Sequence, residues 1–510
     1  MQSISAQSLA SIRDFGPQEI ANTAWACAQL MFFDAPLLHA PSRAAIAPLK
    51  GGCVQNITNT AWAFAQLKYK NTTFFNSISS EVISKLPEYR ERDMSIMAWS
   101  FARREVRDDT LLDAISAAAI RRRCQLIGRA QELANLAWAV AVCDFRDGTL
   151  LNSIASAAIP TCIEKFTAQE LTNLLWSFAS LKCRHEPLLE SIASSARTLS
   201  LQASTQNLVN TAWALDVLDW TDPQGMLHMI RSFAEAPRGA LGVEWTTLAA
   251  IVEKEGLASQ APRFVRDFEA LVLRPVVGHL AAVRQAATDA VLVERMKAFQ
   301  EWVVALQVPS LGAAHTRDAL LAAGAASGGF KASQADGPEW LRGAREAVSA
   351  AAWWSCPHAA VSSQGVVAWV AARLEVAGGA VVGEPGRVFV ADDSAEHSIL
   401  VERMLQPVHL QVPRNGHAER RALVSLIRQV SRAFGHDHHE RWDETQGFVQ
   451  LYASHFPCIS CLASVAQFCR RMPQVSVQVE FDNAWADWRE RPLPEPERAG
   501  APILAIGRAA

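Results

Sequence analysis

Two short motifs near the end of the chain hold residue types that bind and use a metal ion. His417 and Glu419 are separated by one residue, and Cys458 and Cys461 form a C-x-x-C pair directly after Pro457. One imidazole and two thiolates are typical zinc ligands, and three protein ligands leave the fourth tetrahedral position open, where water is bound and acidified. Glu419 is not needed as a ligand, so its carboxylate is free to move protons between that water and a substrate. The four residues therefore predict a hydrolytic zinc site.

The surrounding sequence predicts the elements that would bring these residues together. Residues 475–481 alternate between apolar and polar side chains, as a half-buried strand does, and the His/Glu and Cys/Cys motifs each open an apolar helical pattern. We expect strands at 387–390, 407–412, 447–452 and 475–481, and helices at 417–434 and 461–471.

In this order, residues 385–490 resemble the zinc-dependent deaminase superfamily, which carries an H-x-E motif and a P-C-x-x-C motif. The resemblance is greatest to the branch shared by bacterial toxin-type deaminases and the editing domains of organellar RNA-editing factors. It implies a cytidine-deaminase-like α/β/α sandwich in which His417, Cys458 and Cys461 ligate Zn²⁺ and Glu419 is the catalytic proton shuttle. The motif occurs in both cytidine and adenosine deaminases, and we favour cytidine.

Other interpretations of the same motifs remain open. A structural zinc site would need a fourth protein ligand, which Cys469 or His455 could supply. A redox C-x-x-C pair would need neither His417 nor Glu419. A deaminase fold could also be retained for binding without catalysis.

The first 220 residues contain an internal repeat. Six tryptophans are spaced 37, 37, 39, 38 and 37 residues apart. In five of the six copies an Asn stands three residues before the tryptophan. These tryptophans are Trp25, Trp62, Trp99, Trp138, Trp176 and Trp213. A period of this length predicts an α-solenoid of helical hairpins, each with a tryptophan-bearing helix A and a following helix B. We therefore assign residues 1–220 to an array of about six repeats.

Helix A of each repeat carries a stripe of polar residues beside its tryptophan. Positions −7, −3, 0 and +4 relative to the Trp lie within a sector of roughly 60° at about 100° per residue. The stripe could stack and hydrogen-bond bases of a nucleic acid, or it could be a ladder of hydrogen bonds between neighbouring repeats. The RNA-binding candidates are Gln18, Asn22, Trp25, Gln55, Asn59, Trp62, Arg103, Gln131, Asn135, Gln169, Asn173, Gln206 and Asn210.

Arginines form one basic concentration in the array, at Arg103, Arg104 and residues 121–123. These side chains could meet phosphate, or they could lie on a solvated helix face.

The N-x-x-W-A core and the repeat length resemble the octotricopeptide and heptatricopeptide repeat proteins of algal and protist organelles, over residues 15–220. The resemblance implies binding of single-stranded RNA and a location in a mitochondrion or plastid, although no transit peptide is visible. With ten scattered cysteines, the chain otherwise reads as a protein of a reducing intracellular compartment.

The remaining segments carry weaker signals. Residues 221–384 lose the period and are expected to form a helical middle region and linker, and 491–510 a Pro-rich tail. The formal net charge of −3 argues against a polybasic nucleic-acid-binding protein. The apolar run at 366–382 contains Arg373 and Glu375, so we expect no membrane span. No small-molecule cofactor beyond zinc is expected.

Taken together, the sequence predicts a site-directed RNA-editing deaminase, in which the repeats hold single-stranded RNA and the zinc site hydrolyses an exocyclic amine. One alternative is a non-catalytic organellar RNA-binding or stability factor that retains the deaminase fold. Another is a protein-binding repeat scaffold joined to a nucleotide deaminase.

Overall fold

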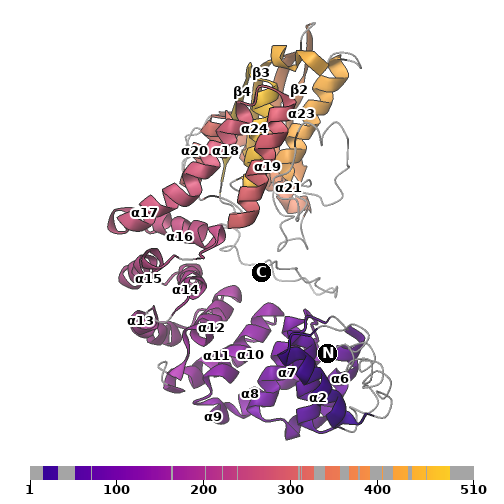
Figure 1. Cartoon of the computed structure of the whole chain (residues 1–510), viewed down its shortest axis with the longest axis vertical. Coiled ribbons are helices and arrows are strands. Elements are labelled where there is room, and N and C mark those ends of the chain that lie inside the picture. The colour runs from indigo at the N-terminus through magenta and orange to yellow at the C-terminus, as the bar shows by residue number, and fades with distance from the viewer. Residues whose placement is uncertain are drawn as a thin grey trace. The chain divides into compact units, whose positions relative to one another are not determined.

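The computed structural model divides the chain into two compact units, Met1–Pro237 and Arg238–Ala510 (Figure 1). It describes residues 15–32, 52–69, 72–161, 165–200, 203–220, 222–237, 239–307, 311, 313–326, 339–355, 367–376, 379–390, 405, 417–434, 439–454 and 457–482. The strand expected at 407–412 and the tail at 491–510 lie outside these residues.

Unit 1 consists of helical hairpins that stack in the order of the sequence (Figure 1). The helix A of each repeat, which carries the stripe, is in chain order α2 (Pro17–Gln29), α5 (Val54–Gln66), α7 (Glu91–Arg103), α10 (Ala130–Val142), α12 (Ala168–Ser180) and α14 (Thr205–Val217). The B helices are α6 (Thr72–Lys85), α8 (Asp109–Arg121), α11 (Gly148–Ala158), α13 (Glu186–Ser200) and α15 (Pro223–Glu235). Short helical turns η2 (Leu86–Glu88), α9 (Arg123–Leu126) and η3 (Ile159–Thr161) join some of them. The expected helical repeats are therefore present.

Each helix A ends in the same backbone turn. In the fourth repeat, Asp144 has a positive φ of 48°, its N–H donates to the carbonyl of Ala141, and the Phe145 N–H donates to that of Val140. This is the Schellman pattern, which satisfies the last carbonyls of a helix and redirects the chain. The equivalent residues with positive φ are Met31, Lys68, Glu105, Asp144, Lys182 and Asp219. Their spacing repeats that of the tryptophans, so the turn fixes where every helix B begins.

The B helices are linked by a ladder of side-chain hydrogen bonds. Asp147 caps α11 by accepting from the amides of Thr149 and Leu150, and it also accepts from the hydroxyl of Ser116 in the preceding repeat at 2.5 Å. Asp108 caps α8 and accepts from Ser79 in the same way. One carboxylate thus satisfies helix-end donors and joins two repeats at once.

Unit 2 begins with helices that continue the period of the array although they lack its tryptophan. α16 (Gly242–Lys254) follows an N-cap at Leu241, 37 residues after the N-cap Ser204 of α14. Gly256, with φ of 64°, stands 37 residues after Asp219. The backbone of α16 therefore has the form of a seventh helix A.

The remaining helices of unit 2 before its sheet are α17 (Pro262–Phe268), the π-turn η6 (Glu269–Leu273), α18 (Arg274–Arg284), α19 (Asp289–Leu306), α20 (Ala313–Ala323) and α21 (Glu339–Ser355), with the short η5 (Ala258–Gln260). They agree with the helical character expected of the middle region.

A mixed four-stranded sheet forms the rest of unit 2, in the order β2-β1-β3-β4. β1 (Val367–Val376) pairs antiparallel with both β2 (Ala380–Val390) and β3 (Gln446–Ala453), and β3 pairs parallel with β4 (Val475–Phe481). α23 (Ala418–Phe434) and the 3-10 turn η8 (His439–Glu444) precede β3, and α24 (Ile459–Arg471) connects β3 to β4. The expected strand 387–390 is the end of β2, so the predicted boundary at 385 falls inside a strand.

Helices cover both faces of this sheet. On one face, Trp340 of α21 stacks on Trp369 of β1 with ring centroids 5.8 Å apart. On the other face, Glu384 of β2 accepts hydrogen bonds from Ser425 and Gln429 of α23 at 3.0 and 2.6 Å. Glu384 pairs with Ala372 across the β1–β2 ladder, and Trp369 and Ala372 point to opposite faces because side chains alternate along a strand. The sheet is therefore the middle layer of three.

The middle helices are bound to α24. Arg470, whose side chain is 8% exposed, donates to the carbonyl of Ala286 at 2.7 Å and to Asp289 at 3.0 Å, and Arg471 reaches the other oxygen of Asp289 at 2.8 Å. Ala326 also pairs with the outer edge of β4, by hydrogen bonds with Val477 and Val479. The region expected to be a linker thus supports the helix that follows Cys458.

The apolar run at 366–382, considered above as a membrane span, contains β1 and the start of β2. Within the described residues, no helix combines the length and the apolar character needed to cross a bilayer.

We predict that Asp289→Asn loosens the attachment of α24 by about 1 kcal/mol, because Arg470 and Arg471 lose their charged acceptor. The measurement is urea denaturation with hydrogen exchange resolved over α19 and α24. Partial burial acts to raise the pKa of Asp289, but hydrogen bonds and charges from Arg471 and Arg470 outweigh it and hold the pKa below its ordinary value of 3.8. A lowered folded pKa adds stability that is fully present above the unfolded pKa, so the difference between the two proteins should shrink as the pH falls below about 4 and vanish only below the lowered folded pKa.

The matched control is Asp109→Asn, which removes the partner of exposed Arg107 at the start of α8 and involves no other helix. An equal effect of both substitutions, or none at α24, would contradict the assigned role of Asp289.

Candidate metal centre

The candidate metal ligands stand where two helices begin. The carbonyl of His417 accepts from the Arg421 amide at 3.0 Å, and the carbonyl of Cys458 accepts from the Leu462 amide at 3.0 Å. These are the first hydrogen bonds of α23 and α24, so His417 and Cys458 each occupy the N-cap position. Cys461 follows in the first turn of α24. All three candidate ligands therefore lie at the N-terminal ends of α23 and α24.

The structure brings the three ligand atoms together. Nδ1 of His417 lies 3.5 Å from Sγ of Cys458 and 3.4 Å from Sγ of Cys461, and the two sulfur atoms are 3.5 Å apart. His417 and Cys458 are half-buried, whereas Cys461 is buried. The cluster consequently has one open side and one closed side.

This triangle has nearly the size that zinc requires. Tetrahedral coordination with Zn–S of about 2.3 Å and Zn–N of about 2.0–2.1 Å gives sulfur–sulfur edges of about 3.8 Å and sulfur–nitrogen edges of about 3.6 Å. The observed edges of 3.4–3.5 Å are slightly shorter, and a small outward movement of the side chains would match them. The residues present therefore fit a zinc ion with three protein ligands.

Glu419, in the first turn of α23, is placed beside this cluster with one oxygen unused. Its side chain is 3% exposed, and its Oε2 is buried without a hydrogen-bond partner. Burial first, and then the neighbouring Cys458, raise the pKa of this carboxyl. An unpartnered buried carboxylate oxygen is costly unless it meets a ligand that the site is built to hold.

The thiols also indicate a cation. The hydrogen bond with Cys458 first, and then burial, raise the pKa of Cys461 well above its ordinary value. Two adjacent thiolates would repel each other in this setting, whereas a bound divalent ion deprotonates coordinating thiols outright.

The alternative fourth ligands are not part of the described cluster. His417, Cys458 and Cys461 form the group of metal-ligating residues found among the described residues, and Cys469 is buried two turns further along α24. His455 lies outside the described residues.

The stripe residues of the array lie on the surface of helix A. The Gln at position −7 is exposed in every repeat that carries it, and the tryptophans are half-buried except Trp25, which is 46% exposed. Successive A helices are neighbours, and the rings of Trp99 and Trp138 lie 6.3 Å apart at 34°. The six stripes thus form a continuous polar and aromatic surface.

Hydrogen bonds between repeats are made by other residues. The described links include the Ser–Asp pairs of the B helices, a 3.1 Å contact between the hydroxyls of Thr172 and Thr211, and hydrogen bonds from Arg184 to the carbonyls of Leu218 and Asp219 in the next repeat, both at 3.2 Å. These Ser–Asp links lie on the B helices and are distinct from the ladder of Asn and Gln side chains considered for the stripe of helix A.

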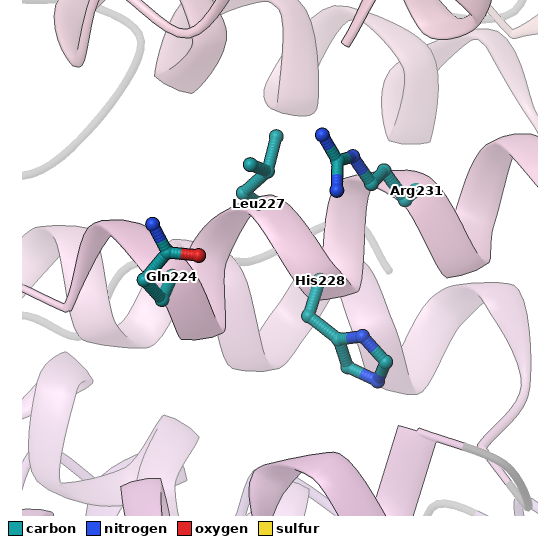
Figure 2. A pocket seen from close by; sticks show the side chains of 4 residues that line it. All are labelled: Gln224, Leu227, His228 and Arg231. Carbon is teal, nitrogen blue, oxygen red and sulfur yellow. The ribbon is translucent and has the colours of Figure 1, made fainter. Parts of the chain in front are cut away.

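A hollow of about 270 Å³, which the sequence did not indicate, lies on α15. Figure 2 shows the side chains that line it. Gln224, Leu227, His228 and Arg231 line it, and Leu227 and Arg231 point to one side of the helix while His228 points to the other (Figure 2). The spacing of these residues by three and four is that of one helix face. It offers one amide and one guanidinium to a polar ligand.

Comparison with known families gives one match. Residues 53–227 match the family described as the RNA-editing substrate-binding complex 6 protein. The matched stretch runs from the second repeat into α15 and covers about a third of the chain, so it is consistent with the helical repeats and does not reach the metal-ligand cluster. No curated protein matches the chain.

We predict that Cys461→Ser removes zinc from the purified protein, because two remaining ligands hold the ion too weakly. The measurement is zinc content per chain by atomic absorption. The control is Cys469→Ser, which changes a buried cysteine of the same helix outside the triangle and should leave the zinc content near one ion per chain. Equal zinc in both variants would exclude this centre.

Proposed function

We propose that the chain is an RNA-editing deaminase, in which the helical repeats bind single-stranded RNA and the His417–Cys458–Cys461 centre serves hydrolytic removal of a base amine. The observation that carries the proposal is the combination of a zinc-sized ligand triangle with the unpartnered Oε2 of Glu419. A purely structural zinc site would have no use for a buried carboxylate oxygen that is left without a hydrogen-bond partner.

The roles of the residues follow from their positions. Zinc, when bound, supplies a Lewis acid with one open coordination position. Glu419 would take one proton from the attacking water at Oε2 and pass it to the ring nitrogen, and would then carry the second proton of that water to the leaving amine, so that the amine departs as ammonia and a carbonyl remains. The raised pKa of Glu419 suits a group that must hold a proton between these two transfers.

The arrangement of unit 2 supports the same reaction class. The order of strands and helices agrees with the order that the resemblance to deaminases implies, and α21 supplies the layer on the face of the sheet opposite α23. The half-buried edges of His417 and Cys458 leave a side from which a base could approach.

The repeats support RNA as the partner. Indole rings beside amide side chains form a surface on which bases can stack and hydrogen-bond, and the matching family is named for the binding of RNA-editing substrates. Cytidine as the target base, and an organelle as the location, stay predictions that rest on resemblance.

A second candidate is a non-catalytic RNA-binding component of an editing assembly. The observation that favours it is the family match, because it covers the repeats alone and its name describes substrate binding. A protein scaffold joined to a nucleotide deaminase is distinguished from both by the absence of RNA crosslinks to the repeats.

We predict that Glu419→Gln keeps its zinc and its RNA binding but lowers base conversion by about 10²–10⁴-fold, because the proton shuttle is lost. The measurement is sequencing of RNA incubated with each protein, or of transcripts from cells with and without it, for changes at cytidine and adenosine. Glu384→Gln is the control, because Glu384 is also buried against α23 but bonds to Ser425 and Gln429. Wild-type protein that holds zinc and RNA yet converts no base would favour the non-catalytic candidate.

A further inference from the structure

The third repeat differs from the others along its helix A, α7. Arg92 stands at the stripe position where the other five repeats have Gln, and Arg103 at the position where the first two have Gln. Arg104 follows at a position that is otherwise apolar, occupied by Leu30, Leu67, Cys143, Leu181 and Leu218. Four of those five apolar side chains are buried. Three cationic replacements in one repeat set it apart from its neighbours.

Two of these arginines share a face with a tryptophan. At about 100° per residue, Arg92, Trp99 and Arg103 fall within roughly 40° of the circumference of α7, and the two arginines are separated by about 16 Å along its axis. Trp99 lies between them and faces Trp138 of the next repeat, with ring centroids 6.3 Å apart. A pair of indoles is thus bordered by a cation at each end.

The charges of this surface are not neutralised by the repeat itself. Arg92 and Arg103 are exposed, and neither forms an ion pair within the part of the chain that the structure describes. Other arginines of the array do pair with acidic side chains, namely Arg107, Arg122, Arg129, Arg146 and Arg184. Arg122 also donates to the carbonyls of Pro87 and Tyr89, which explains its presence as a structural contact.

Arg104 adds an unsatisfied donor at the same end of α7. Its Nε is buried without a hydrogen-bond partner. Burial lowers the pKa of Arg104, and the adjacent charge of Arg103 acts in the same direction, whereas Glu105 opposes them. This Nε is buried and out of reach of a ligand, so Arg104 contributes its positive charge at this end of α7 rather than a hydrogen bond from Nε.

We propose that the third repeat is the phosphate anchor of the array: Arg103 and Arg104 at one end of Trp99, and Arg92 at the other, bind backbone phosphates of single-stranded RNA whose base stacks on Trp99 and Trp138. The proposal rests on the RNA binding proposed above and adds the place where the backbone is held. RNA is favoured over an acidic peptide because indoles between the cations provide a stacking surface for bases. Phosphate contacts carry no base identity, so this repeat would fix the register while the others differ in contacts to bases.

A purely structural role makes a different prediction. Arg103 and Arg104 lie in the last turn of α7, where positive charge is favourable to the helix dipole. If that is their whole function, substitution should lower the melting temperature and leave the salt dependence of RNA binding unchanged.

The test uses the full chain with the double variant Arg92→Gln/Arg103→Gln and, separately, Arg104→Leu. Each new residue already stands at the equivalent position of other repeats, so the hairpin should still fold, as circular dichroism will check. The matched control is Arg121→Gln, an exposed arginine on helix B of the same repeat. Binding of labelled oligouridylate and oligoadenylate is measured by fluorescence anisotropy between about 50 and 200 mM salt.

The double variant should reduce the slope of log K against log salt by about 1.4, because each phosphate contact to a single strand contributes about 0.7. Arg104→Leu alone should reduce the slope by about 0.7, both RNAs should respond alike, and Arg121→Gln should leave the slope unchanged. An equal loss in Arg121→Gln would indicate diffuse attraction and overturn a local anchor, as would unchanged slopes in all variants.

The outcomes separate this proposal from the proposed function. Wild-type binding with the anchor variants unchanged refutes the anchor alone. Absence of wild-type RNA binding refutes the anchor together with the RNA-binding role. If polyglutamate binds as strongly as RNA, and its binding also depends on Arg92 and Arg103, the surface is a site for acidic peptides instead. Base conversion by the metal centre is read in a separate assay and is not affected by either result.

Discussion

The candidate metal centre depends on the meeting of the N-terminal ends of α23 and α24 beside the sheet. His417 and Cys458 are the N-cap residues of α23 and α24, so the geometry that begins each helix also aims its ligand. Because backbone hydrogen bonds at the helix starts fix His417 and Cys458, the triangle of ligand atoms has nearly the dimensions that zinc requires.

The position of those helix starts depends in turn on segments far away in the sequence. Glu384 on β2 holds α23 through Ser425 and Gln429, while Asp289 holds the far end of α24 through Arg470 and Arg471. The middle helices are therefore part of the unit that carries the centre. In the array, the corresponding constraint is the turn with positive φ that ends every helix A, which sets the period independently of the tryptophan.

The sequence predicted the repeats and the grouping of His417, Cys458 and Cys461 because both depend on residue identity and spacing. It missed β1, since the run around Trp369 is apolar on both sides of the strand and shows no alternation, as expected for a central strand covered on two faces. It also missed α16 as a seventh helix A, because Val243, Thr247 and Ala250 replace the Gln, Asn and Trp of the stripe while the backbone turn is kept at Gly256. The attachment of Asp289 to α24 joins residues too distant in sequence for any pattern to indicate.

The most direct measurement is the zinc coordination of the purified chain by X-ray absorption spectroscopy. We expect zinc to have two sulfur ligands at about 2.3 Å, one imidazole nitrogen at about 2.0–2.1 Å and one further light atom from solvent. A third sulfur or a second imidazole would mean a closed structural site, and the proposed hydrolytic role of Glu419 would then be refuted.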